Sequence, residues 1–170
     1  LLRLLWPYPG VPRYLEVARH LPYGPHPQQV ADRYRRPAGG PTAPVLVQVH
    51  GGGWTSGRRG WQGRPLVHRM AQQGWVVFDL EYRLSPRATF PDQLIDLKRA
   101  IAWIRATAAE HGADPSFVAV AGGSAGGHLA ALAALTSGDP AYQPGFEEAD
   151  CSVQACVPVY GVHDWLDNAG

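Results

Sequence analysis

The sequence has little of several features that would assign it to a specialised class. It holds two cysteines among 170 residues, Cys151 and Cys156. These are too few for a disulfide framework, and no histidines lie near them at metal-site spacing, so no metal site is predicted. Whether the two cysteines pair with each other stays open. No stretch reaches the roughly 20 apolar residues of a membrane-spanning helix. The formal net charge is only +1 without a long basic run, which argues against nucleic-acid binding.

What the sequence does contain is enough apolar residues for one domain core, at 45% of the chain. Apolar runs predict strands at residues 45–49, 75–80, 117–121 and 153–160. Between the strands, apolar residues recur at helical spacing over 66–71, 94–104 and 125–135. Strands alternating with helices at short intervals predict an α/β fold, with a mostly parallel central sheet covered by helices on both faces.

The N-terminal segment has a different composition. Six prolines between residues 7 and 27 predict an extended arm or covering segment, because proline fixes φ and removes a backbone donor. We therefore divide the chain into this segment, residues 1–28, and a single α/β portion, residues 29–170. Within the second part, 29–35 is expected to be an edge strand and 37–44 a turn or hairpin connection.

The residues from Gly122 to Gly126 form a G-x-S-x-G pattern between an expected strand and an expected helix. This arrangement is typical of a nucleophile elbow. A serine on a sharp strand-to-helix turn is pushed out of both elements, so its hydroxyl faces a cleft. The turn leaves no room for side chains two residues to either side, which explains Gly122 and Gly126. We therefore predict that Ser124 is a catalytic nucleophile.

A second motif, His50-Gly51-Gly52-Gly53-Trp54, follows the strand expected at 45–49. In hydrolases with an elbow serine, such a glycine loop supplies amides that bind an oxyanion. The expected donors are the amides of Gly52, Gly53 and Ala125. His50 and Gly51 are expected to support the loop. Trp54 is expected either to line the acyl or alcohol pocket or simply to pack.

Three stretches carry a resemblance to a known family: HGGGW at 50–54, YRLSPRATFP at 82–91 and AGGSAGGHLAALAAL at 121–135. They resemble the hormone-sensitive-lipase-like branch of the α/β-hydrolase fold, especially actinobacterial carboxylesterases and lipases. The resemblance runs from about Val45 to His163. It implies hydrolysis of small to medium acyl esters through a Ser–Asp–His triad, with no metal or cofactor. One departure is Gly123, where many members carry an acidic residue.

The triad partners of the serine are not evident in the sequence. In this fold the acid and then the histidine follow the serine. His128 lies one turn into the elbow helix and cannot swing back to the Ser124 hydroxyl. His163 and Asp164 follow an apolar run, so we expect them to line the pocket or to structure a loop. The less favoured alternative is that His163 is the general base, which would need its own acid upstream. The chain opens on Leu1 and stops just after a strand, and the resemblance implies that a cap and two further strands carry the acid and the histidine beyond it.

Two other functions use the same residues. A formamidase or peptidase would employ the same elbow, and a non-catalytic binder would resemble those plant hormone receptors that have lost the triad histidine but keep the pocket. The retained Ser124 and the intact glycine loop favour an enzyme. Residues 1–6, LLRLLW, fit either the end of an upstream membrane segment or signal, or an amphipathic lead-in. The sequence therefore assigns neither a compartment nor an oligomeric state.

Overall fold

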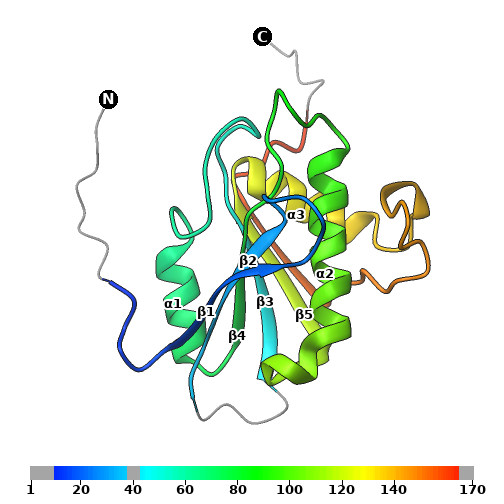
Figure 1. Cartoon of the computed structure of the whole chain (residues 1–170). Coiled ribbons are helices and arrows are strands. Elements are labelled where there is room, and N and C mark those ends of the chain that lie inside the picture. Colours follow the sequence, from blue (N-terminus) through cyan, green and yellow to red (C-terminus); the bar gives the residue numbers. More distant parts are fainter. Residues whose placement is uncertain (1–9, 38–42, 165–170) are drawn as a thin grey trace, which may run out of the picture.

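The computed structural model describes residues 10–37 and 43–164, which are arranged around one sheet (Figure 1). Within these residues, six strands lie in the order β1-β2-β4-β3-β5-β6. Their bounds are Glu16–Pro22 (β1), Val30–Arg35 (β2), Ala43–Val49 (β3), Val76–Leu80 (β4), Ala113–Gly123 (β5) and Ala155–Val159 (β6). The strands β4, β3, β5 and β6 are parallel, whereas β1 and β2 pair antiparallel at one edge. The predicted mostly parallel sheet is confirmed.

Helices cover both faces of the sheet, also as predicted (Figure 1). Their bounds are Arg64–Gln72 (α1), Asp92–His111 (α2) and Ala125–Leu135 (α3), and a short 3-10 helix follows at Pro140–Tyr142. The helices α2 and α3 pack on one face and α1 on the other. The two parallel-sheet faces are thereby removed from water, which is why β3 and β4 are continuous apolar runs rather than alternating ones.

The apolar periodicity of α2 identifies its core-facing side correctly. Leu94, Leu97, Ile101 and Ile104 are all buried against the sheet. Glycines mark the C-terminal ends of two helices. Gly74, two residues after α1, and Gly112, directly after α2, adopt positive φ angles of 92° and 67°. A glycine in this conformation closes a helix without a Cβ penalty.

The segment assigned to a covering arm contains a strand instead. Residues Glu16–Pro22 form β1, which pairs with β2 and belongs to the same sheet as the rest of the chain. Within the described residues, β1 rather than 29–35 is therefore the edge strand, and the division of the chain into 1–28 and 29–170 stays a prediction. The high proline content made this strand hard to predict. Pro22 is its last residue, and an edge strand such as β1 tolerates proline. Residues 1–9 of the predicted arm and 38–42 of the predicted turn lie outside the described residues.

Two sequence questions are settled by the fold. Cys151 and Cys156 are free thiols, and burial raises the pKa of Cys151 to about 11. The last strand is shorter than expected, because only Ala155–Val159 pairs with β5. Pro158 lies next to its end, in accordance with the preference of proline for strand ends and edges. No helix in the described part of the chain is both long and apolar enough to cross a membrane.

Candidate active site

Ser124 occupies the turn between β5 and α3, where the G-x-S-x-G pattern places it. Its backbone has φ 56° and ψ −123°, a positive-φ conformation that residues with a side chain rarely adopt. The Ser124 amide donates a 3.0 Å hydrogen bond to the Val159 carbonyl on β6, and its carbonyl accepts one of 3.0 Å from the His128 amide. The strained turn is thus held from the sheet on one side and from α3 on the other.

The glycines around the serine bring the elbow and the glycine loop into direct contact. A Cβ atom on Gly122 would lie 2.3 Å from the Gly126 carbonyl oxygen, and one on Gly126 would lie 2.3 Å from the carbonyl oxygen of Val49 at the end of β3. A Cβ atom on Gly51 would lie 3.3 Å from the Ser124 Cβ. Only backbone fits between these segments, so both G-x-S-x-G glycines are needed for packing.

The expected oxyanion donors have the backbone that such a loop requires. Gly52 and Gly53 have φ angles of 126° and 60°, in the region that favours glycine. The Gly52 carbonyl accepts hydrogen bonds from the amides of Thr55 and Ser56, which closes the loop into a turn. Within the described part of the chain, the Gly52 and Gly53 amides donate to no protein acceptor. Both amides are therefore available to a ligand.

His50 holds the start of this loop. Its ring is buried, and its Nδ1 lies 2.8 Å from the Gly51 carbonyl oxygen. Because a carbonyl only accepts, Nδ1 carries the proton in this hydrogen bond. Burial lowers the pKa of His50, so the imidazole is neutral at pH 7. This geometry suits the supporting role that we predicted for His50.

An apolar cavity of about 430 Å³ adjoins the glycine loop. Trp54 and His128 form part of its wall, with their rings edge to face at a centroid distance of 5.3 Å. Trp54 thus lines this cavity and also packs against the hydrophobic core, and His128 is a wall residue of the same cavity. Most of the remaining lining comes from the loop before α2 and from α3, through Ser85, Phe90, Gln93, Leu129 and Leu132.

His163 and Asp164 are exposed, and His163 lies beside the first turn of α3. A Cβ atom on Gly161 would lie 2.7 Å from the His163 Cε1 and 2.8 Å from the His128 amide nitrogen. Among the described residues, no histidine ring hydrogen-bonds to the Ser124 hydroxyl. The structure therefore brings His163 close to the elbow helix, with no hydrogen bond from its ring to the Ser124 hydroxyl.

Gly123, the residue at which this chain departs from the pattern that the resemblance implies, lies close to Tyr160. A Cβ atom on Gly123 would lie 2.8 Å from the Tyr160 hydroxyl oxygen. Tyr160, at a positive φ of 40°, thus lies next to Gly123, the position where the resemblance leads us to expect an acidic side chain. An acidic residue at this position would require the Tyr160 ring to move.

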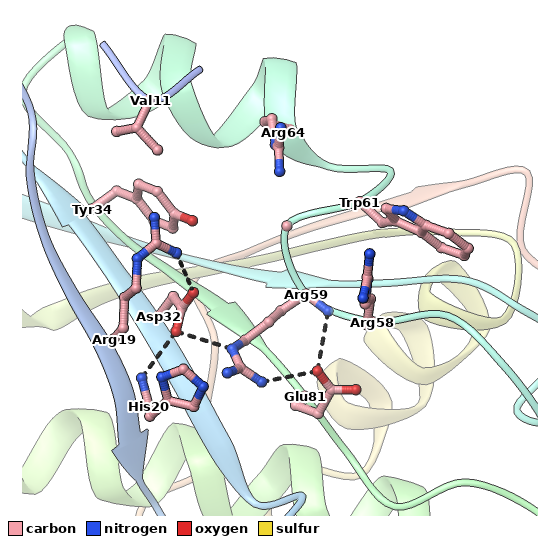
Figure 2. Close-up of a pocket in the computed structure, with 11 residues that line it drawn as sticks. Val11, Arg19, His20, Asp32, Tyr34, Arg58, Arg59, Trp61, Arg64 and Glu81 are labelled. Carbon is pink, nitrogen blue, oxygen red and sulfur yellow. Dashed lines mark hydrogen bonds and ion pairs between the residues drawn. The ribbon is translucent and has the colours of Figure 1, made fainter. Parts of the chain in front are cut away.

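An ion-pair cluster that the sequence analysis missed anchors the segment after the glycine loop (Figure 2). Arg59 pairs with Asp32 on β2 and with Glu81 after β4, each at 3.0 Å. The adjacent Gly60 amide donates a 2.5 Å hydrogen bond to Asp79, whose pKa burial raises to about 7. Asp79 thus holds the backbone of the segment that follows the glycine loop. The sequence could not predict that Arg59 binds both Asp32 and Glu81, because this arrangement depends on the β2–β4 register.

The described residues show no donor set for a metal. Over residues 10–37 and 43–164, no three His, Cys, Asp or Glu side chains gather in a group that could hold an ion.

An elbow serine packed against a glycine loop at the edge of a mostly parallel sheet defines an α/β-hydrolase core. The chain belongs to the BD-FAE family, whose model matches residues 31–170.

Individual relatives agree with this assignment. The chain is 51% identical to "Esterase LipQ" of Mycobacterium tuberculosis over 160 residues, covering 92% of this chain and 38% of that relative. It is 57% identical to "Probable carboxylic ester hydrolase LipM" of the same organism, covering 73% of this chain and 29% of that relative. The chain therefore spans about a third of the length of these curated relatives. The resemblance to actinobacterial esterases predicted from the motifs is confirmed.

Solved structures support the fold independently. Thermogutta terrifontis esterase 2 phosphonylated by cyclosarin is 32% identical, with a TM-score of 0.73 over 94% of this chain and 60% of that chain. Esterase B from Lactobacillus Rhamnosis (HN001) is 29% identical, with a TM-score of 0.72 over 89% of this chain and 47% of that one.

Proposed function

We propose that this chain carries the nucleophile and the oxyanion-binding residues of a serine carboxylic-ester hydrolase that acts on small to medium acyl esters. The observation that carries the proposal is the strained Ser124 turn in contact with the Gly51 backbone. Strain of this kind persists where the surrounding structure enforces it, and it is concentrated at functional sites. The names of the curated relatives, which are esterases and an ester hydrolase, support the same reaction.

The residues have distinct roles in the proposed reaction. The Ser124 oxygen attacks the ester carbonyl carbon and forms a tetrahedral intermediate. The amides of Gly52, Gly53 and Ala125 donate hydrogen bonds to its oxyanion, and one such donor is typically worth roughly 10²–10³ in turnover. A histidine from outside the described residues takes the serine proton and returns it to the leaving alcohol. Water then hydrolyses the acyl-enzyme by the same route.

The apolar cavity beside Gly53 indicates the class of substrate that we propose. Its volume of about 430 Å³ lies in the range of small-molecule sites. Trp54, Leu129 and Leu132 present carbon surface to it, so it suits an acyl or alcohol chain rather than a charged group. No cofactor is needed for this chemistry.

A fluorophosphonate probe tests the proposal. The full-length protein that contains these residues should be labelled covalently, and Ser124→Ala should abolish the labelling. A Ser152→Ala variant, which alters a serine away from the elbow, serves as the control and should be labelled like the wild type. Labelling of Ser124→Ala at the wild-type rate would reject Ser124 as the nucleophile.

The same probe and p-nitrophenyl butyrate should be applied to residues 1–170 alone. We expect this chain to hydrolyse the ester no faster than its Ser124→Ala variant, because no described histidine hydrogen-bonds to the Ser124 hydroxyl. A clear difference between the two would instead make His163 a candidate base.

A further inference from the structure

A second cavity, of about 620 Å³, lies near the β1 edge of the sheet (Figure 2). Its walls come from β1, β2, the segment after β4, and residues 58–64 between the glycine loop and α1. Two strands, β3 and β4, separate β2 from β5, which leads to the elbow serine. None of the residues that line the apolar cavity lines this one. The two cavities are therefore separate sites.

Positive charge exceeds negative charge in the second cavity. Four arginines line it, against two carboxylates, which leaves an excess of two positive charges. Both carboxylates are already engaged, because Asp32 pairs with Arg19 and Arg59, and Glu81 pairs with Arg59. The excess therefore resides on the remaining two arginines, Arg58 and Arg64.

Arg58 and Arg64 have no carboxylate partner within the described part of the chain. Of the residues outside the described ranges, 1–9 and 38–42 contain no Asp or Glu, and 165–170 contain one, Asp167. Arg64 Nη2 would lie 3.7 Å from a Cβ atom on Gly60, so its guanidinium is directed toward the cavity from the start of α1 (Figure 2). Two guanidinium groups are thus available for a ligand.

An aromatic ring completes this group. Trp61 is 55% exposed, and the Arg58 guanidinium carbon lies 5.3 Å from its ring centroid. Leaving half of an indole in water is unfavourable relative to covering it. The ring lies beside Arg58 and lines the same cavity as Arg64, so it offers a flat apolar surface to the body of an anionic ligand (Figure 2).

We propose that this pocket binds a phosphate group attached to an organic body, with Arg58 and Arg64 on the phosphate and Trp61 against the body. Guanidinium groups present forked donors that match phosphate oxygens, and they are the usual choice for phosphate recognition. An excess of two positive charges matches a phosphate monoester dianion better than a single carboxylate. The cavity is also larger than an inorganic phosphate needs, which leaves room for the attached group.

The phosphate belongs either to a soluble phosphate monoester or to a phospholipid headgroup. Phenyl phosphate represents the first source. Vesicles of phosphatidylglycerol, compared with vesicles of phosphatidylcholine, represent the second. This binding does not depend on Ser124, so the pocket can be tested whether or not the protein hydrolyses esters.

Isothermal titration calorimetry with phenyl phosphate, and co-sedimentation with the two kinds of vesicle, measure the binding. The double variant Arg58→Gln/Arg64→Gln should weaken it by at least about tenfold, because charge-assisted hydrogen bonds are lost. Arg36→Gln removes one positive charge from an exposed site outside the cavity, so it matches each single variant, Arg58→Gln or Arg64→Gln, and should bind like the wild type. Trp61→Leu should weaken phenyl phosphate binding while leaving inorganic phosphate binding unchanged.

Saturable binding of phenyl phosphate that is sensitive to the double variant supports the pocket with a soluble ligand. Binding to phosphatidylglycerol vesicles alone, with the same sensitivity, supports it with a lipid headgroup. No saturable binding to either, or equal weakening by Arg36→Gln, overturns the proposal. Circular dichroism of each variant checks that the fold is retained, and the single variants Arg58→Gln and Arg64→Gln replace the double one if it is not.

Discussion

The Tyr82 hydroxyl donates a 2.9 Å hydrogen bond to the His50 carbonyl oxygen, and the two rings stack at a centroid distance of 4.3 Å. Tyr82 follows β4 and His50 follows β3, so this contact ties the ends of two parallel strands together immediately below the glycine loop. It connects two of the motifs recognised in the sequence, HGGGW at 50–54 and YRLSPRATFP at 82–91. The second motif therefore supports the first.

Tyr82→Phe tests this connection. The variant keeps the stacked ring but leaves the buried His50 carbonyl without its donor, so the free energy of unfolding should fall by about 1–2 kcal/mol. Denaturant unfolding followed by circular dichroism measures the change. Tyr160→Phe, at a position that is 72% exposed, provides the matched control and should change the stability by less than about 0.5 kcal/mol. Equal effects of the two substitutions would show that the Tyr82 hydroxyl does not stabilise the strand ends.

Gly126→Ala tests the contact between the elbow and β3. The added Cβ would lie 2.3 Å from the Val49 carbonyl oxygen and 2.7 Å from that of His50, and both are backbone atoms that cannot rotate away. We expect a loss of at least about 1–3 kcal/mol in the free energy of unfolding. Gly138→Ala, where no heavy atom lies within 4 Å of the new Cβ, should be nearly neutral. If both variants melt like the wild type, the elbow does not pack as described.

Asp79→Asn tests the buried carboxylate under Gly60. Burial raises the pKa of Asp79 from 3.8 to about 7, so between these values the native state holds a proton that the unfolded state has lost. Titration of Asp79 therefore lowers the free energy of unfolding of the wild type as the pH rises from about 4 to about 7. Asp79→Asn cannot titrate at this position, so its free energy of unfolding does not show this decrease. Relative to the wild type, Asp79→Asn should gain stability across that window by a few kcal/mol, at about 1.4 kcal/mol per pKa unit. Urea unfolding at pH 4, 5.5 and 7 measures it. A difference that is constant across the three pH values would contradict a raised Asp79 pKa.

Leu132→Trp tests the proposed substrate cavity in the catalytically active protein. The larger side chain should fill part of the cavity of about 430 Å³ and lower kcat/KM for hexanoate esters about tenfold relative to acetate esters. Steady-state kinetics with p-nitrophenyl esters of both lengths gives this ratio. Leu135→Trp lies on the same helix at a position that is 83% exposed and should leave the ratio unchanged. An unchanged ratio in Leu132→Trp would place the acyl chain elsewhere.

The central strands and the helices could be predicted from the sequence because their signals are local. Continuous apolar runs identified β3 and β4, and three- or four-residue spacing identified the buried face of α2. The prediction failed at β1, since prolines at either side outweigh a short strand signal and only pairing with β2 makes this segment a strand. Leu66 belongs to the apolar pattern over 66–71 but is exposed, because a single turn of apolar residues does not fix which side of α1 meets the sheet.

The sequence by itself determined the elbow serine, the glycine loop and the order of strands and helices, because each depends on residues that are neighbours in the chain. Only the tertiary structure decided which distant residues meet. The register between β2 and β4 sets Asp32 beside Asp79, and it is this pairing that lets Arg59 bind Asp32 and Glu81 together. The ion pairs of Asp32 with Arg19 and with Arg59 likewise bring Arg19 and Arg58 to one cavity. Such contacts arise from strand pairing and side-chain packing across long sequence separations, which no local pattern records.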